Sequence, residues 1–149
     1  MIEVRVQSED FDLGAEAKRL TAGHREIGAL VTFSGLVRDT NQDLQSMTLE
    51  HYPGMTEKAL QSIAEEASKR WSLIACLIIH RYGPMVPGDQ IMMVAAASAH
   101  RQASFEAADC MMDYLKSRAP FWKQEATAKD ANWVDARQID ENALKRWRS

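Results

Sequence analysis

The 149-residue sequence lacks the features of membrane, secreted and nucleic-acid-binding proteins. No apolar run approaches the roughly twenty residues that a membrane span needs, and the first residues lack the apolar core of a signal peptide. Eighteen Lys and Arg stand against twenty-one Asp and Glu, so the formal net charge of -3 attracts neither nucleic acid nor an anionic membrane. We therefore expect a cytoplasmic protein whose basic sites are local.

Cysteine is scarce, and histidine has no metal-ligand spacing. Cys76 and Cys110 stand too far apart in the sequence to form a metal knuckle or a redox pair. In the cytoplasm both would stay reduced, so we expect them to be small buried residues. The sequence therefore predicts no resident metal and no cofactor, because its four histidines are scattered as well: His24, His51, His80 and His100.

Several motifs of common enzyme classes are also missing. The sequence has no Gly-rich phosphate loop, no G-x-G-x-x-G, no H-E-x-x-H and no G-x-S-x-G, which removes the main support for NTPase, dinucleotide-binding, zinc-protease and hydrolase functions. Internal repeats and Gly/Ser linkers are absent too. We expect residues 1–149 to form a single domain, large enough to bury about two thirds of its unfolded surface.

Periodic apolar patterns predict alternating strands and helices. Strands are expected over residues 2–7, 27–37, 46–52, 73–80, 91–97 and 121–126, with 27–37 as a long central strand and 73–80 and 91–97 as a buried hairpin. Helices are expected to begin near Asp12, Thr56 and Ser98, and a last helix to cover 140–147. Ser98 is expected to cap its helix, and Phe105 to belong to its apolar stripe. The order predicts an α+β fold with helices packed on a mainly antiparallel sheet.

Basic residues stand at the expected start of the third helix. His100 and Arg101 directly follow Ser98, where unpaired amides and the positive end of the helix dipole favour an anion. This position suits a phosphate or a carboxylate. The alternative is that Arg101 only pairs with an acidic neighbour such as Glu106.

A second concentration of charge follows the third helix. Lys116 lies in the expected last helical turn, where a lysine is a common partner of the helix dipole. Period-two alternation in the next strand places Phe121, Lys123 and Glu125 on one face. A lysine beside aromatic rings and another cation can exchange protons near neutral pH, so this pattern is typical of a catalytic lysine.

A resemblance to a known family rests on ordered blocks of sequence at residues 28–38, 49–58, 80–83, 87–89, 98–101 and 112–125. Over residues 28–137 the chain resembles the large, catalytic subunit of molybdopterin synthase. The resemblance implies an α/β hammerhead fold and a homodimer of large subunits with a small subunit at each end, a heterotetramer. It implies transfer of sulfur, twice, from the carboxyl-terminal thiocarboxylate of a ubiquitin-like small subunit to cyclic pyranopterin monophosphate. The product is the dithiolene of molybdopterin, and no cysteine of this chain is required.

The resemblance also implies roles for individual residues. Lys116 and Lys123 correspond to the two active-site lysines. We assign Lys116 to the thiocarboxylate end, Lys123 to proton transfer and substrate positioning, and Glu125 to orienting Lys123. A pocket for the substrate phosphate and the partner's tail would be lined by Arg38, His100, Arg101 and Arg137, with Phe33 either walling the pterin or packing in the core. Gln124 and Ser117 depart mildly from the family pattern and remove no proposed catalytic group.

Two other functions stay open at this point. The chain could be a non-enzymatic anion-binding or nucleotide-binding regulatory module that uses His100 and Arg101. It could also be a persulfide sulfurtransferase, which requires Cys76 or Cys110 to be exposed with a lowered pKa. The first alternative tolerates alanine at Lys116 or Lys123, whereas the enzyme does not.

Overall fold

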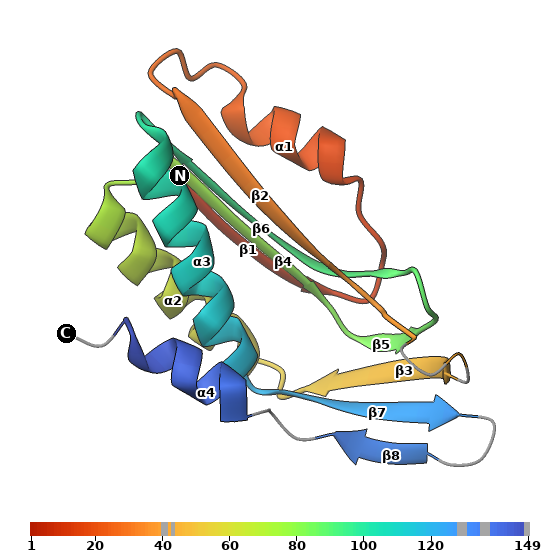
Figure 1. Ribbon diagram of the computed structural model, residues 1–149. Coiled ribbons are helices and arrows are strands. Elements are labelled where there is room, and N and C mark those ends of the chain that lie inside the picture. Colours follow the sequence, from red (N-terminus) through yellow and green to blue (C-terminus); the bar gives the residue numbers. More distant parts are fainter. Residues whose placement is uncertain (40–41, 43, 128–130, 135–137, 148–149) are drawn as a thin grey trace.

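The computed structural model describes residues 1–39, 42, 44–127, 131–134 and 138–147, in which strands and helices alternate (Figure 1). The strands are β1 (Ile2–Gln7), β2 (Ala29–Leu36), β3 (Leu44–His51), β4 (Ala75–Arg81), β5 (Gly83–Met85), β6 (Gln90–Ser98), β7 (Phe121–Thr127) and β8 (Ala131–Val134). The helices are α1 (Leu13–Thr21), α2 (Met55–Trp71), α3 (Arg101–Ser117) and α4 (Gln138–Lys145). None of the described helices is long and apolar enough to cross a membrane.

The strands form two sheets instead of the one that the sequence predicts. The first has the order β1-β4-β6-β2, in which β1 pairs with β4 in parallel and the other neighbours are antiparallel. The second has the order β5-β3-β7-β8 and is antiparallel throughout. It projects from the end of the first sheet where α3 ends and β7 begins (Figure 1). The predicted α+β class with mainly antiparallel pairing is confirmed.

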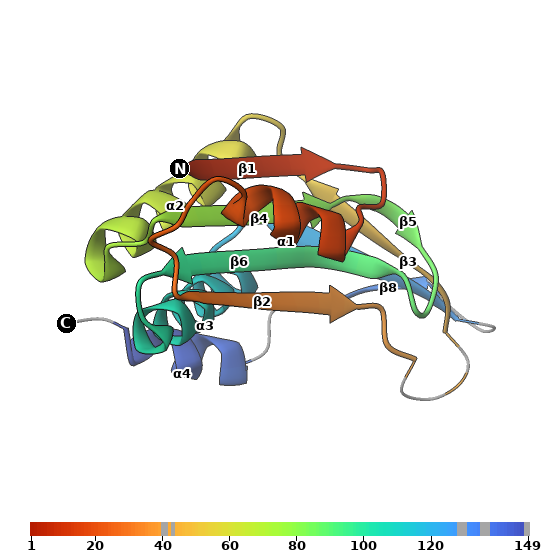
Figure 2. The ribbon, with the colours of Figure 1, turned by 90° about the horizontal axis from the view of Figure 1, so that it is seen from above.

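Helices cover both faces of the first sheet because β4 and β6 are apolar on both sides. On one face, Cys76, Ile78 and Val94 pack against α2 and α3. On the other face, Leu77 and Ile79 pack against α1, which Figure 2 shows lying over this side of the sheet. Burial of such side chains contributes about 25 cal/mol for each Å² of apolar surface removed from water. The predicted antiparallel pairing of these two buried strands is confirmed, but they do not form a simple hairpin, because β5 lies between them in the chain and pairs with β3 in the second sheet.

Strand β2 is an edge strand, so its predicted central place is wrong. It pairs with β6 on one side only, and its apolar side chains remain accessible: Leu30 is 36% exposed, Phe33 42% and Leu36 55%. The apolar run over residues 27–37 predicts a central strand. In the structure, part of this apolar run is instead exposed at the edge of the sheet, where no other described part of the chain covers it.

Two expectations for α3 are also wrong. His100, and not Ser98, is the residue before the helix, while the Ser98 hydroxyl donates to the His100 carbonyl and contacts Ser104 Oγ. Phe105 is 60% exposed, because the buried stripe of α3 is instead formed by Ser104, Ala107, Ala108, Cys110, Met111 and Leu115. Small residues on this face let α3 lie close to the sheet.

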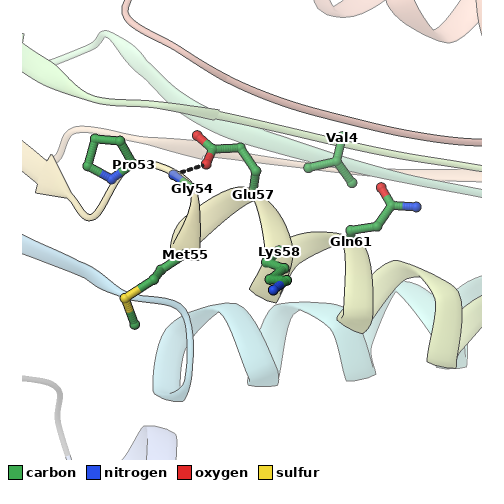
Figure 3. Close-up of a pocket in the computed structure, with 7 residues that line it drawn as sticks. All are labelled: Val4, Pro53, Gly54, Met55, Glu57, Lys58 and Gln61. Carbon is green, nitrogen blue, oxygen red and sulfur yellow. Dashed lines mark hydrogen bonds between the residues drawn. The ribbon is translucent and has the colours of Figure 1, made fainter.

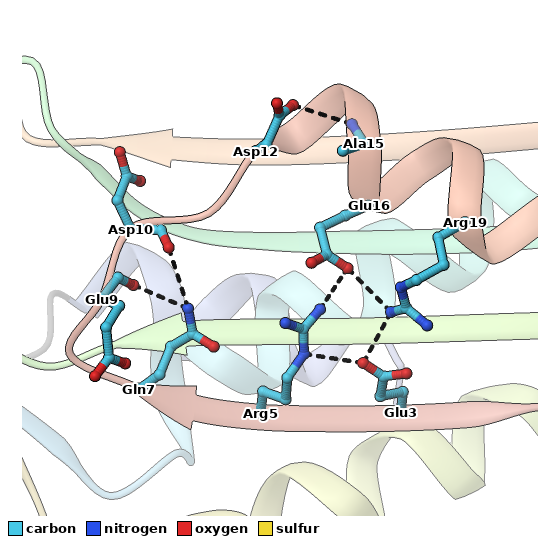
Figure 4. A network of polar contacts seen from close by, with 9 residues as sticks. All are labelled: Glu3, Arg5, Gln7, Glu9, Asp10, Asp12, Ala15, Glu16 and Arg19. Carbon is cyan, nitrogen blue, oxygen red and sulfur yellow. Dashed lines mark hydrogen bonds and ion pairs between the residues drawn. The ribbon is translucent and has the colours of Figure 1, made fainter.

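A polar network ties α1 to β1 (Figure 4). Glu16 on α1 accepts hydrogen bonds from Arg5 on β1 and from Arg19, and Arg19 also donates to Glu3 at 2.8 Å. Partial burial raises the pKa of Glu16, but the two arginines outweigh this effect and the pKa lies below its ordinary value. These residues hold α1 against the sheet and belong to the fold.

Gly28 fixes the approach of β2 to the segment that carries His100. A Cβ atom at position 28 would lie 2.2 Å from the carbonyl oxygen of Ala99, and the Gly28 amide donates to the Ser98 carbonyl at 3.0 Å. We expect Gly28→Ala to lower the free energy of unfolding by about 1–3 kcal/mol, because backbone atoms must move apart. Urea unfolding measures this change.

The matched control is Gly14→Ala in α1, whose new Cβ would meet only Asp12 Oδ1, at 3.6 Å. Alanine favours a helix over glycine, so this variant should be neutral or slightly stabilised. If both variants unfold at the same urea concentration as the parent, the close approach at Gly28 is wrong.

Candidate active site

The predicted catalytic lysines lie where the end of α3 meets the second sheet, a region that we call the junction. Lys116 is in the last turn of α3, and β7 begins four residues after that helix ends, at Phe121. Lys123 Nζ lies 3.7 Å from Glu125 Oε1, and each side chain is a little over one third exposed. The predicted shared face of Lys123 and Glu125 is therefore confirmed.

The Lys123–Glu125 pair stands beside an apolar surface. Strand β7 pairs with β3 so that Lys123 lies opposite Leu49 and Glu125 opposite Met47. Leu49 and Met47 are buried in a cluster with Val37 and Met85. Because cross-strand partners share a face of the sheet, the ion pair is partly shielded from water, which strengthens its mutual attraction.

His80, on β4 of the first sheet, contacts the second sheet at the junction. Its ring is 8% exposed and stacks on Phe121, with centroids 3.7 Å apart and planes 18° apart. Nδ1 donates to the Arg81 carbonyl at 2.9 Å. Burial lowers the pKa of His80 to about 4, and the positive charge of Lys116 acts in the same direction. His80 is thus a neutral group that joins β4 to β7.

Arg38 lies at the same end of the first sheet as the lysines. It follows Val37, which is buried against Met47 and Leu49 of the second sheet. The Arg38 side chain is exposed, so its guanidinium is available to an anion. The structure therefore places Arg38 directly after a residue that packs on Leu49 and Met47, the cross-strand partners of Lys123 and Glu125.

His100 and Arg101 lie at the opposite end of α3 from Lys116. A helix of 17 residues is about 25 Å long. Both side chains are exposed, next to the start of β2, because Ser98 pairs with Ala29. The structure thus does not bring them into one cavity with the lysines inside a single chain. The alternative pairing with Glu106 is not observed in the described residues, since Glu106 accepts from Gln102 and Trp71.

Phe33 lies on the exposed edge of the first sheet and is not part of the core. Its ring covers Gly35, because a Cβ atom at Gly35 would lie 3.6 Å from Phe33 Cε1 and 3.5 Å from Met92 Sδ. The position favours the interpretation of Phe33 as a wall of a binding surface. Arg137 lies outside the described residues.

A surface hollow of about 690 Å³ lies elsewhere, at the start of α2 (Figure 3). In Figure 3 the Glu57 carboxylate turns back to accept from the Gly54 amide, so the residue caps the helix. None of the predicted site residues lines this hollow, whose walls are Val4, Pro53, Gly54, Met55, Glu57, Lys58 and Gln61.

Both cysteines have the structural role that the sequence predicts. Cys76 is fully buried and Cys110 is 7% exposed. Burial raises the pKa of each thiol to about 11, so neither is a thiolate at neutral pH.

One junction residue was missed by the sequence analysis, which gave His51 no role beyond that of a histidine without metal-ligand spacing. His51 ends β3, directly opposite Phe121, and its ring lies 4.6 Å from that of Tyr82. The spacing of two places His51 on the same face of β3 as Leu49, but its position beside Lys123 depends on the register between β3 and β7, for which the sequence gives no signal.

Comparison with known proteins agrees with the resemblance seen in the sequence. The family model described as MoaE protein matches residues 6–118. A molybdopterin synthase catalytic subunit from Cereibacter sphaeroides is 57% identical over 146 residues, which covers 98% of this chain and 100% of the relative. Relatives therefore match almost the whole chain.

Solved structures agree as well. The molybdopterin biosynthesis MoaE protein from Burkholderia ambifaria has a TM-score of 0.86 and 52% identity, covering 99% of this chain and 98% of that one. A protein–protein complex of subunits 1 and 2 of molybdopterin-converting factor from Helicobacter pylori has a TM-score of 0.74 at 18% identity over 91% of each chain, which shows the fold alone. The chain belongs to the MoaE family, the catalytic subunits of the sulfur-transferring enzyme molybdopterin synthase.

Proposed function

We propose that this chain transfers sulfur from the carboxyl-terminal thiocarboxylate of a ubiquitin-like small subunit to cyclic pyranopterin monophosphate, with Lys116 and Lys123 as catalytic lysines. The observation that carries the proposal is that one short segment presents both lysines at the junction, with Glu125 held 3.7 Å from the Lys123 ammonium. Thiocarboxylate and cyclic phosphate are both anionic, so they require cations at the same place.

Four residues have different tasks in this proposal. Lys116, at the exposed end of α3, holds the thiocarboxylate of the tail. Lys123 transfers protons and positions the pterin, and Glu125 orients Lys123 through their ion pair. Arg38 binds phosphate oxygens, for which a guanidinium fork is suited.

The remaining cations require a second copy of the chain in this proposal. Within one chain His100 and Arg101 are about a helix length from Lys116, yet an anionic cyclic phosphate and an anionic tail call for several cations together. The open edge of β2 offers Leu30, Phe33 and Leu36 to a partner. A homodimer through this edge would place His100 and Arg101 of one copy near the lysines of the other, with Arg137 completing the pocket.

The partner and the setting of the reaction follow from the same proposal. The Helicobacter pylori relative is described as a complex of two subunits of molybdopterin-converting factor, and we assign this chain a small-subunit partner of the same kind. A heterotetramer results, with a small subunit at each end of the dimer.

Free, buried cysteines suit the reducing cytoplasm. We treat residues 1–149 as one domain, since α3 joins both sheets.

Reconstitution tests this function against the persulfide alternative. We expect the chain to form dithiolene from the pterin only when the small subunit carries a thiocarboxylate and not an ordinary carboxylate. A Cys76→Ala/Cys110→Ala double variant should work at close to the parent rate, because neither buried thiol takes part. Product is measured by mass spectrometry, and thermal unfolding shows that the variant is folded. Loss of product in the folded double variant would support the persulfide mechanism instead.

A further inference from the structure

His51 shares the lysine-bearing face of the second sheet. It lies opposite Phe121 in the pairing of β3 with β7, and Lys123 is two residues further along β7. Diagonal neighbours of this kind have Cβ atoms about 7–8 Å apart, within reach of long side chains. His51 therefore belongs to the junction, although its residue type gave no sign of this in the sequence.

Hydrogen bonds fix which nitrogen of His51 carries the proton. Thr56 Oγ1 donates its single proton to the Tyr52 carbonyl at 2.9 Å, so it accepts in its contact with His51 Nδ1, at 3.1 Å. Nδ1 is then the protonated nitrogen, and Nε2 keeps a lone pair. Thr56 is fully buried at the start of α2, so the group that orients the ring is itself rigid. This is how enzymes orient a histidine base.

The surroundings leave His51 accessible, in contrast to His80. The His51 ring lies 4.6 Å from Tyr82 and 6.0 Å from Phe121 and is half-buried. His80, in contrast, is buried and stacks on the Phe121 ring. Of these two histidines, only His51 can offer its Nε2 lone pair to a molecule bound beside the lysines.

We infer that His51 is a further catalytic residue, the general base for the water that frees the tail of the small subunit. The inference rests on the proposed function. When a thiocarboxylate sulfur bonds to a pterin carbon, the tail and the pterin are joined through a thioester, which must be cleaved before the product can leave. The site therefore needs a base that activates water, in addition to cations.

The step balances with groups that are already present. One proton of the water passes to His51 Nε2 while the oxygen adds to the acyl carbon of the thioester. The bond between acyl carbon and sulfur breaks, and its electron pair stays on the sulfur, which remains on the pterin. The tail is released as a carboxylic acid that ionises, and His51 returns its proton to solvent. A well-placed base of this kind accelerates a reaction by about two to four decades.

The test uses the full complex with thiocarboxylated small subunit and cyclic pyranopterin monophosphate. We expect His51→Phe, which keeps a ring against Tyr82, to slow product formation by at least about 100-fold while the small subunit still binds. Acid-quenched samples should contain small subunit whose mass is increased by the pterin. His51→Ala should show the same adduct, and added imidazole should restore turnover. The control Tyr82→Phe keeps the packing and should be normal.

Normal turnover in His51→Phe, or slow turnover without the adduct and without rescue by imidazole, would overturn the assignment. If the parent complex itself makes no dithiolene, the proposed function fails. If the parent is active and only the His51 results differ from expectation, the proposed function stands and this inference falls.

Discussion

Lys116→Ala is expected to abolish dithiolene formation while the chain still binds the small subunit. The Lys116 side chain is exposed in the last turn of α3, so its loss removes no buried packing. It does remove the cation that the proposal assigns to the thiocarboxylate, a contribution of about two to four decades in rate for a group acting directly on the reacting atoms. Product formation and size-exclusion chromatography of the complex measure the two properties separately.

Lys69→Ala provides the matched control for this variant. Lys69 is also exposed and also lies in the last turn of a 17-residue helix, α2, so both changes remove the same interaction with a helix dipole. Only Lys116 lies at the junction. Near-normal turnover in Lys116→Ala would refute its catalytic role.

The predictable part of the fold is the part determined by local patterns. Strands β4 and β6 were expected because each is a continuous apolar run that only a sheet covered on both faces can bury. Strand β5 was missed because Gly83 and Pro84 are typical of a turn, and its strand geometry arises from distant pairing with β3. The edge position of β2 was missed because an apolar run does not reveal whether a neighbouring strand or another molecule covers it.

In the candidate site, too, local sequence patterns predicted some features, and contacts between distant segments determined the others. The shared face of Lys123 and Glu125 followed from period-two alternation inside one strand. The separation of Arg101 from Lys116 could also have been predicted, because both were placed on one helix whose length is about 1.5 Å for each residue. His51 could not be placed, since its relation to Lys123 depends on the register between β3 and β7.

Mixing two inactive variants is expected to restore activity if the site is built from two copies of the chain. A His100→Ala/Arg101→Ala variant and the Lys116→Ala variant should each be nearly inactive at low pterin concentration. In a two-fold symmetric dimer that exchanges subunits freely, half of the dimers are mixed, and one of the two sites in each mixed dimer is intact, so about a quarter of the parent activity should return.

The control for this experiment is a mixture of Lys116→Ala with Lys123→Ala. Both lysines come from the segment that links α3 to β7, so each site of a mixed dimer lacks one of them and no activity should return. Recovery in the first mixture and not in the second requires His100 and Arg101 to act on the lysines of another copy. If neither mixture recovers although mass spectrometry detects mixed dimers, the two-copy site is refuted, and the cations at the start of α3 have a role apart from the lysines.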